Sequence, residues 1–308
     1  MPSWDSLQPI EPFLRWAGGK RKLVASLVEY VPNDFRKRHY HEPFLGAGSL
    51  FLSLQPSRAT LSDANPHLIQ CYRQVSSETA EVSYHLSRFA ASNSEQFYYR
   101  IRDEYNNSED SPQQAARFIY LNKTCFNGIF RVNTKGQFNV PYGHKEPPSI
   151  PSFETLNAAS RLLRHARISN SSFEKSLAKV RGDHFVYLDP PYPPLNGTTA
   201  YFTHYTKDRF GENDQILLSE HVKHMSSIGA KVLMTNADLP IIRKLYHDFH
   251  IRILPVTRYV SCKSKKIKVN ELAITNYDTG DRQSCDSCRV MIRSTKRVSH
   301  VRRNQATR

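Results

Sequence analysis

Long apolar runs are missing from this sequence, since no stretch approaches the roughly 18 apolar residues of a membrane-spanning helix. Residues 1–8 lack the basic and apolar regions of a signal peptide, so we expect neither export nor membrane association. The five cysteines are scattered and odd in number, which argues against a disulfide framework and for a reducing compartment. Cys285 and Cys288 form one C-x-x-C pair without a second, so we expect no metal site.

Acidic residues are outnumbered by basic ones, 28 against 43, which gives a formal net charge of +15. This balance favours a polyanionic partner, nucleic acid before an anionic membrane surface, although many basic proteins bind neither. The last part of the chain, residues 281–308, holds eight basic and two acidic residues. We expect this tail to be disordered and to add non-specific affinity for DNA.

An acidic, proline-rich motif follows a short apolar run in the second half of the chain. Asp189, Pro190, Pro191 and Tyr192 come directly after residues 185–188, which predict a buried strand that the prolines end. In open α/β sheets, ligands bind outside the carboxyl ends of strands. A carboxylate, free carbonyls and an aromatic face suit a planar ring with an exocyclic amine. The alternative is a turn that only closes a core strand.

Two glycine-containing turns near the amino terminus indicate a nucleoside ligand. Residues 16–20 (WAGGK) precede a helical pattern, and residues 46–48 (GAG) lie between a predicted strand and a predicted helix. Asp63 ends the second predicted strand, where an acid commonly accepts both ribose hydroxyls; alternatively it caps the helix after Asn65. The glycine pair is not a full dinucleotide fingerprint, so we predict an adenosine-containing ligand without phosphates.

Residues 66 to about 120 lack sheet periodicity and predict a helical insertion. It leads into residues 120–143, where aromatic residues, glycines, asparagines and basic residues alternate in a way that we expect a buried core not to tolerate. We predict a loop-and-hairpin surface that contacts DNA, because Arg can bind guanine, Asn can bind adenine and apolar tips can wedge between bases. The alternative is an ordinary surface hairpin.

The α/β pattern returns after the insertion. Helices are predicted over residues 153–164 and 213–228, and strands over 167–169 and 231–236. Residues 251–256 and 271–276 predict a closing antiparallel pair, which a lysine-rich connector joins. We expect the loop of residues 193–207 to close over a base or over DNA.

Six motifs occur in one order along the chain: residues 13–20 (FLRWAGGK), 42–49 (EPFLGAGS), Asp63, and residues 126–131 (FNGIFR), 138–143 (FNVPYG) and 189–192 (DPPY). With them the sequence resembles the Dam-type DNA adenine-N6 methyltransferases, the alpha group or D12 class, from about residue 11 to residue 277. The resemblance implies a Rossmann-like α/β methyltransferase sheet with an inserted, mainly helical target-recognition domain that contains a β-hairpin. It divides the chain into catalytic parts at 1–65 and 151–278, a recognition domain at 66–150 and a tail at 279–308.

The same resemblance implies S-adenosylmethionine as methyl donor, S-adenosylhomocysteine as product and adenine in double-stranded DNA as acceptor. The catalytic motif would be residues 189–192, with Asp189 and the Pro190 carbonyl accepting the N6 hydrogens and Tyr192 stacking on the flipped base. The implied cofactor contacts are Trp16, Ala17, Gly18, Lys20, Phe44, Gly46, Asp63, Phe173 and Asp189.

The implied DNA contacts are Arg15, Asn127, Ile129, Arg131, Asn133, Asn139, Pro141 and Lys145. Arg15 and Arg131 stand where the family reads guanines, and Asn127 where a side chain fills the space that the flipped base leaves. GATC is the leading recognition sequence, although His144-Lys145 departs from the pattern of close relatives and Ser172 stands where many have an acid. We expect a cytoplasmic, nucleoid-associated monomer of bacterial or phage origin, either solitary or part of a restriction-modification pair.

Two other functions are compatible with parts of this pattern. A methyltransferase of RNA adenine or of a protein amide would also use an Asp-Pro-Pro-Tyr loop, but the hairpin between the cofactor and catalytic motifs argues against it. A non-catalytic DNA-binding descendant is expected to have lost Lys20, Asp63 or Asp189, and all three are present.

Overall fold

A seven-stranded sheet organises the fold, with the strand order β3-β2-β1-β4-β5-β7-β6. The computed structural model describes residues 8–144, 147–193, 210–260 and 265–280, with the side chains of residues 256–260 and 265–269 excepted. The strands are β1 (His39–Glu42), β2 (Ala59–Asp63), β3 (Ala166–Asn170), β4 (His184–Leu188), β5 (Lys231–Ala237), β6 (His250–Val260) and β7 (Lys265–Thr275). β1 to β5 are parallel, and β7 runs antiparallel to both of its neighbours.

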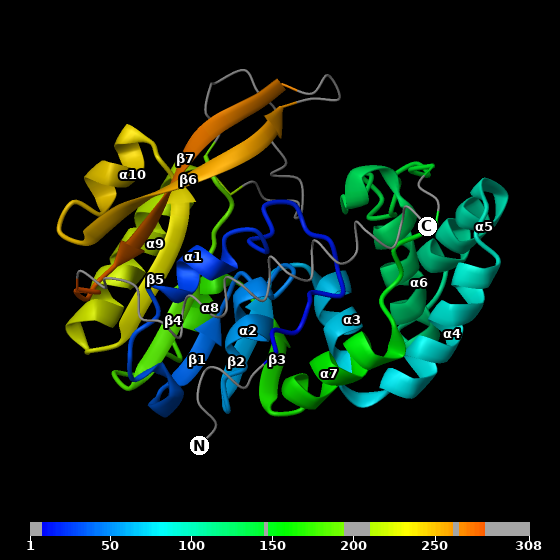
Figure 1. Cartoon of the computed structure of the whole chain (residues 1–308), viewed down its shortest axis with the longest axis horizontal. Helices are drawn as coiled ribbons and strands as arrows, with labels where there is room; N and C mark the ends of the chain where they lie inside the picture. Colours follow the sequence, from blue (N-terminus) through cyan, green and yellow to red (C-terminus); the bar gives the residue numbers. More distant parts are fainter. Residues whose placement is uncertain (1–7, 145–146, 194–209, 261–264, 281–308) are drawn as a thin grey trace, which may run out of the picture.

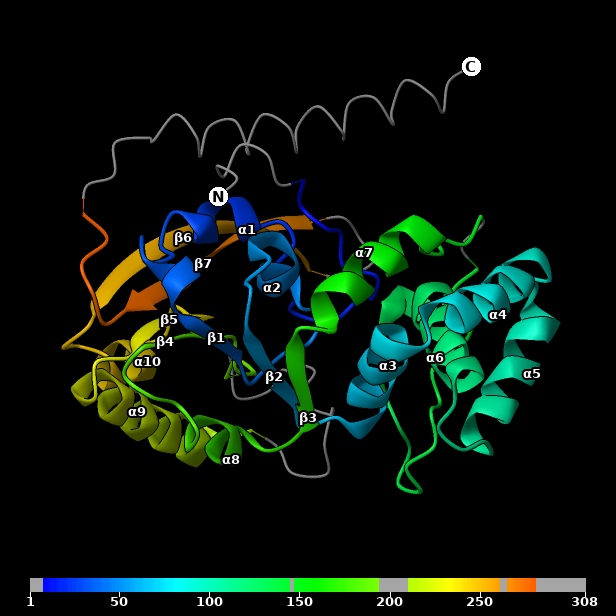
Figure 2. The same cartoon turned by 90° about the horizontal axis from the view of Figure 1, so that it is seen from below.

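Helices cover both faces of the sheet (Figure 2). They are α1 (Val24–Val28) and α2 (Ser49–Leu54) on one face, and α8 (Phe173–Leu177), α9 (Glu212–Ser227) and α10 (Pro240–Leu245) on the other, with a 3₁₀ turn η2 (Phe35–Lys37) before β1. Because strand side chains alternate between faces, Phe185 and Tyr187 of β4 join the core on one side of the sheet. Val186 and Leu188 join the core under α9 on the other side.

The predicted insertion is helical, and most of it lies beside the sheet rather than over it (Figure 1). It is followed by α7 (Phe153–Leu163), the helix predicted over residues 153–164. The insertion itself comprises α3 (Pro66–Ser77), α4 (Thr79–Ala91), α5 (Glu95–Asn106), α6 (Pro112–Thr124) and the 3₁₀ turn η3 (Phe126–Gly128). Three of these helices begin at side-chain caps, where Asn65, Ser94 and Ser111 accept backbone N–H bonds from the first turn. α3 packs against β2 and β3 as well as α6, so one apolar core runs from the sheet into the insertion.

Most predicted elements are confirmed, with differences at their ends. Within the insertion, α6 begins at Pro112, a position where the missing N–H of proline needs no partner. β6 and β7 extend beyond the predicted arms, to Val260 and from Lys265. No helix in the described part of the chain is long and apolar enough to cross a membrane.

Candidate active site

Two of the predicted motifs, the glycine turn and the Asp189–Tyr192 motif, begin at the carboxyl ends of two adjacent strands. β1 pairs with β4 on one side and with β2 on the other, so the direction in which the chain progresses across the sheet reverses between β1 and β4. Ligands of open α/β sheets bind outside the carboxyl ends of the strands at such a point. The glycine turn after β1 and the Asp189–Tyr192 motif after β4 both start there.

A buried ion pair joins the first motif of the chain to the strand-end motif 169 residues later. The Lys20 ammonium lies 2.7 Å from Oδ1 and 2.9 Å from Oδ2 of Asp189, and it also donates to the Gly18 carbonyl at 2.7 Å. Lys20 is only 6% exposed. The Thr235 hydroxyl of β5 donates to Oδ1 of Asp189 at 2.8 Å. Burial raises the pKa of Asp189, while Lys20 and Thr235 act in the opposite direction.

A second buried carboxylate holds the aromatic residue of the motif. The Tyr192 hydroxyl donates to Oε2 of Glu271 at 2.9 Å, and the Lys20 ammonium lies 4.7 Å from the centre of the Tyr192 ring. Glu271, on β7, is 4% exposed, and its Oε2 is 3.9 Å from the Lys20 ammonium. Burial raises the pKa of the Tyr192 hydroxyl well above its ordinary value. The ring is therefore fixed at both its edge and its face.

The loop between Asp189 and Tyr192 is fixed through its backbone. The Gln215 side chain of α9 donates to the Pro191 carbonyl at 3.0 Å. Gln215 in turn accepts a bond from the Asn236 side chain at 3.0 Å, and both are almost fully buried. Sequence reasoning missed Gln215, Asn236, Thr235 and Glu271 as site residues. The sequence signal that could have identified them is a polar residue in a strand or helix whose neighbouring core positions are apolar.

The glycine turn is tied to the acid at the end of β2. The Gly46 N–H donates to Oδ2 of Asp63 at 3.0 Å, and the Asn65 N–H donates to Oδ1 at 2.9 Å. Gly46 has a φ of +46°, and a Cβ there would lie 2.9 Å from the Trp16 ring. The alternative that Asp63 caps the next helix is wrong, because the Asn65 side chain caps α3. Burial raises the pKa of Asp63, and its bonds from backbone N–H groups oppose this.

Three aromatic rings form an apolar wall beside this turn. The ring centres of Phe44 and Phe173 are 5.6 Å apart in a stacked arrangement, and Phe210 lies 5.8 Å and 5.6 Å from them. Phe173 is brought here because the Ser171 N–H donates to the Asp63 carbonyl just before α8. The predicted cofactor residues Phe44, Gly46, Asp63 and Phe173 are therefore neighbours.

The aromatic residues of segment 120–143 belong to the core, so the expectation that a core would not tolerate this segment is wrong. Tyr120, Phe130, Phe138 and Tyr142 are at most 5% exposed, because α3 to α6 pack around them. Antiparallel bridges join Cys125 to Tyr142 and Val132 to Phe138, which agrees with a hairpin. The tips that remain exposed include Phe126, Asn127, Arg131 and Pro141.

A buried asparagine clamps the start of the chain onto this segment. Asn122 of α6 accepts the Arg15 N–H at 2.8 Å and donates to the Arg15 carbonyl at 2.8 Å and the Gly128 carbonyl at 3.3 Å. Gly128 has a φ of +64°, and a Cβ there would lie 2.6 Å from Cδ of Arg15. Trp16 stacks on Phe130 with ring centres 5.9 Å apart. The predicted base-reading residue Arg15 thus lies against the turn that contains Asn127.

The other predicted DNA residues of the hairpin lie around one exposed edge. The Arg131 guanidinium donates to the Asn139 side chain at 2.8 Å and to its carbonyl at 3.4 Å. Oδ1 of Asn133 accepts the N–H groups of Lys135 and Gln137, which closes the hairpin turn. Ile129 is half-buried, and the Pro141 carbonyl accepts the Phe126 N–H. Lys145, the loop of residues 194–209 and Lys263 lie outside the described residues.

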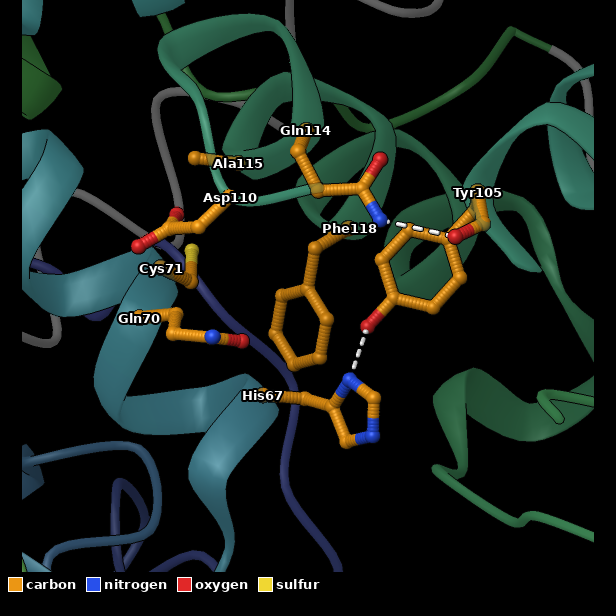
Figure 3. A pocket seen from close by; sticks show the side chains of 8 residues that line it. All are labelled: His67, Gln70, Cys71, Tyr105, Asp110, Gln114, Ala115 and Phe118. Carbon is orange, nitrogen blue, oxygen red and sulfur yellow. Dashed lines mark hydrogen bonds between the residues drawn. The ribbon is translucent and has the colours of Figure 1, made fainter. Parts of the chain in front are cut away.

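A small cavity lies elsewhere, between α3 and the α5–α6 region (Figure 3). Its volume of about 10 Å³ has room for about one water molecule. The Tyr105 hydroxyl and Nδ1 of His67 face each other across it at 2.8 Å, and burial lowers the pKa of His67. None of its lining residues belongs to the Asp189 site. Among the described residues, no group of three or more His, Cys, Asp or Glu is arranged to hold a metal ion.

Comparison with known proteins agrees with this geometry. A family model described as D12 class N6 adenine-specific DNA methyltransferase matches residues 16–260, which include Lys20, Asp63 and Asp189. The type II methyltransferase M.MjaIII of Methanocaldococcus jannaschii is 38% identical over 288 residues, covering 87% of this chain and 99% of that protein. M1.LlaDCHI of Lactococcus lactis is 36% identical, covering 87% and 96%. The DNA adenine methylase of Escherichia coli K12 is 35% identical, covering 84% and 93%.

Proposed function

Because the chain belongs to the D12 class of N6 adenine-specific DNA methyltransferases, we propose that it transfers a methyl group from S-adenosylmethionine to N6 of an adenine flipped out of double-stranded DNA. One observation carries the proposal. The motif with Asp189 and Tyr192 follows β4, and the glycine turn that is bonded to Asp63 follows the adjacent strand β1, at the reversal point of the sheet. This arrangement supports the proposal, in which Asp189 would accept the amine and Tyr192 would stack on the base beside the cofactor.

The residues around the glycine turn fit the cofactor. Bound S-adenosylmethionine would supply an electrophilic methyl group on a sulfonium sulfur. Asp63 uses one backbone bond per oxygen, and a carboxylate has about four lone-pair sites, so it can still accept both ribose hydroxyls. Phe44 and Phe173 offer an apolar wall for the adenine ring. Gly46 leaves room that a side chain would fill, and residues 16–20 close the other side.

The strand-end motif would hold the target base. Flipping costs a few kcal/mol, which stacking on Tyr192 offsets in part. Asp189 and the Pro190 carbonyl would accept the two N6 hydrogens and draw the nitrogen lone pair out of conjugation with the ring. As the bond from N6 to the methyl carbon forms, the bond from that carbon to the sulfonium sulfur would break, with S-adenosylhomocysteine as the leaving group. Asp189 would stabilise the positive charge on the nitrogen until one N6 proton passes to water. Positioning supplies much of the rate, since no side chain becomes covalently attached.

Sequence choice would come from the exposed edge of the hairpin and from Arg15. We propose GATC as the site, with Arg15 and Arg131 reading guanines. The clamp between Arg15 and Asn122 supports this, because a side chain that reads a base needs a fixed backbone. We propose that the protein acts as a monomer where DNA lies, in the nucleoid.

The test is methylation of a plasmid by the purified protein, with modified adenines located by single-molecule sequencing. We expect N6-methyladenine confined to GATC, and none with the Asp189→Ala variant, which should still bind DNA. Arg131→Ala should relax the sequence choice without weakening cofactor binding. Methylation at another sequence would contradict the specificity only. No methylated adenine despite donor binding would favour an RNA or protein acceptor instead.

A further inference from the structure

The Asp189 carboxylate is crowded before any base arrives. The Lys20 ammonium contacts both of its oxygens, and the Thr235 hydroxyl contacts Oδ1 again. A carboxylate has about four lone-pair sites, so three contacts leave one for an incoming N6 amine. The Lys20 charge, however, opposes the positive charge that the proposed reaction creates on that amine. Loosening the ion pair when the target base binds would remove this opposition.

Glu271 is placed to receive the displaced ammonium. Its Oε2 lies 3.9 Å from the Lys20 ammonium, against 2.7 Å for the nearer oxygen of Asp189. A lysine ammonium is a compact charge with three rotatable donors on a flexible stem, so a small swing exchanges one carboxylate for the other. Both carboxylates are largely shielded from water, and moving the ammonium between them never leaves it unpaired in the interior.

We propose that Glu271 is a positioning residue: it takes Lys20 over from Asp189 when the target amine enters, and it orients the Tyr192 ring through the hydroxyl. This inference rests on the proposed methyl transfer and adds the side chains of Glu271 and Lys20 to it. Two carboxylates and one ammonium leave one negative charge in the site. That charge complements both a sulfonium donor and an amine that becomes positive.

A purely structural role would give a different result. If Glu271 only satisfied the Tyr192 hydroxyl, a neutral acceptor in its place would serve equally well. Glu271→Gln is therefore the informative variant, because its amide oxygen can still accept from Tyr192 but carries no charge for Lys20. Tyr192→Phe is its complement, because it removes the hydroxyl bond and leaves Glu271 charged.

The experiment measures kcat and KM for a duplex with one target adenine, in the full-length chain. For Glu271→Gln we expect kcat to fall about tenfold or more with KM for DNA little changed, since a charged contact used in the reaction is lost. We expect a smaller fall for Tyr192→Phe. Glu271→Asp keeps the charge and should lie between the wild type and Glu271→Gln. If thermal unfolding shows that Glu271→Gln does not fold, the other two variants test the inference. A kcat that falls more in Glu271→Asp than in Tyr192→Phe would support it, and the reverse order would contradict it.

The pH profile separates charge from packing. Asp189 faces Lys20, Glu271 and the hydroxyls of Tyr187 and Tyr192, and the charge of Glu271 raises the pKa of Asp189. Burial raises the pKa of Glu42, at the end of β1, well above its ordinary value, and the charge of Asp189 raises it further. In Glu271→Gln, the acid limb of kcat/KM should move to lower pH, whereas in Tyr192→Phe it should move less.

Two results would overturn the inference: wild-type kcat in Glu271→Gln, or a slow variant whose acid limb stays in place. The wild-type control separates this failure from that of the proposed function. If the wild-type chain methylates no adenine, the proposed function fails. If it does, and Glu271→Gln behaves like it, only the role of Glu271 fails.

Discussion

The pKa of Asp189 is set by two opposing effects. Burial raises its pKa, and the Lys20 ammonium lowers it again. An acid whose pKa is raised on folding holds its proton more tightly in the folded chain. Its ionisation therefore lowers stability as pH rises through the window between 3.8 and the raised value. Lys20 is the side chain that narrows this window.

Removing Lys20 should move the pH dependence of activity upward. In Lys20→Met, Asp189 loses the contact that lowers its pKa most, so the acid limb of kcat/KM should shift to higher pH and kcat should fall. The measurement is the rate of DNA methylation between pH 5 and pH 8 at saturating donor.

Arg21→Met is the matched control for Lys20→Met. Arg21 is the next residue along the chain and carries the same charge, but it is exposed and pairs with Glu11 at 2.7 Å. Its removal should leave the acid limb in place. An unchanged limb in Lys20→Met would show that Asp189 is not the titrating group.

Two asparagines fix the predicted DNA-contacting segment, residues 120–143, between the helices. Asn122 bonds both the N–H and the carbonyl of Arg15, and Asn106 at the end of α5 bonds both the N–H and the carbonyl of Phe138. In each case the side-chain amide oxygen accepts the backbone N–H and the amide nitrogen donates to the backbone carbonyl of the same residue. The two clamps hold the segment at opposite ends, so its exposed tips are presented on a rigid base.

Asn122→Ala should weaken sequence discrimination as well as stability. Buried backbone groups of Arg15 and Gly128 would lose their partner, which costs about 1–3 kcal/mol for each unsatisfied group. The ratio of methylation rates on the preferred site and on a site with one guanine replaced should fall about tenfold, because Arg15 is no longer held in place.

Asn276→Ala provides the comparison for this variant. Asn276 makes a similar clamp far from the hairpin, accepting the Val232 N–H at 2.8 Å and donating to the Ala230 carbonyl at 2.7 Å. Its loss should lower the midpoint of thermal unfolding and leave discrimination intact. If both variants discriminate like the wild type, the clamp on Arg15 serves stability alone.

The elements that sequence patterns predicted well are those with local signals. Strand β4, the glycine turn and α9 follow from apolar periodicity and turn residues close in the chain. The burial of Phe130 and Phe138 could not be read locally, because it depends on helices that close over them from residues 66–124. Asn122, Gln215 and Glu271 were missed for the same reason. Their hydrogen-bond partners lie 107, 24 and 79 residues away, and the residues next to them in the sequence do not indicate which partners these are.

At the scale of the whole molecule, three neighbouring histidines on β1 and β4 make stability depend on pH. His41 and His184 stack with ring centres 4.7 Å apart, and His39 lies within 5.0 Å of both. Burial, with the neighbouring histidines, lowers the pKa of His41 to about 3. Nδ1 of His41 is buried without a hydrogen-bond partner among the described residues. The folded chain therefore keeps this imidazole neutral.

The consequence is a loss of stability in acid that His41→Leu should relieve. Below its ordinary pKa of 6.5, His41 takes a proton in the unfolded chain but not in the folded one. The wild type should therefore lose about 1.4 kcal/mol per pH unit relative to the variant as pH falls from 6.5 toward 3. The measurement is the free energy of unfolding in urea at pH 7, 6 and 5.

The informative quantity is the difference in the free energy of unfolding between the wild type and His41→Leu. Glu42, Asp63 and Asp189 have raised pKa values, so their protonation stabilises the folded chain as pH falls and opposes the histidines. These carboxyl groups are common to both proteins and cancel in the difference. If the stability of His41→Leu relative to the wild type is the same at all three pH values, His41 is not the group that causes the loss of stability in acid.

The central position of β1 also has a consequence for how the chain is made. Its neighbour β4 is synthesised only after residues 43–183 have emerged, and the bond from Tyr277 to the Tyr30 carbonyl spans 247 residues. Closing such long loops is slow, whereas helices α3 to α6 make their contacts locally. We therefore expect a growing chain to fold its insertion first and to carry an unpaired edge of β1 until β4 is synthesised. Lys20 lies before β1 and Glu271 lies on β7, so the site is complete only after Glu271 has been synthesised.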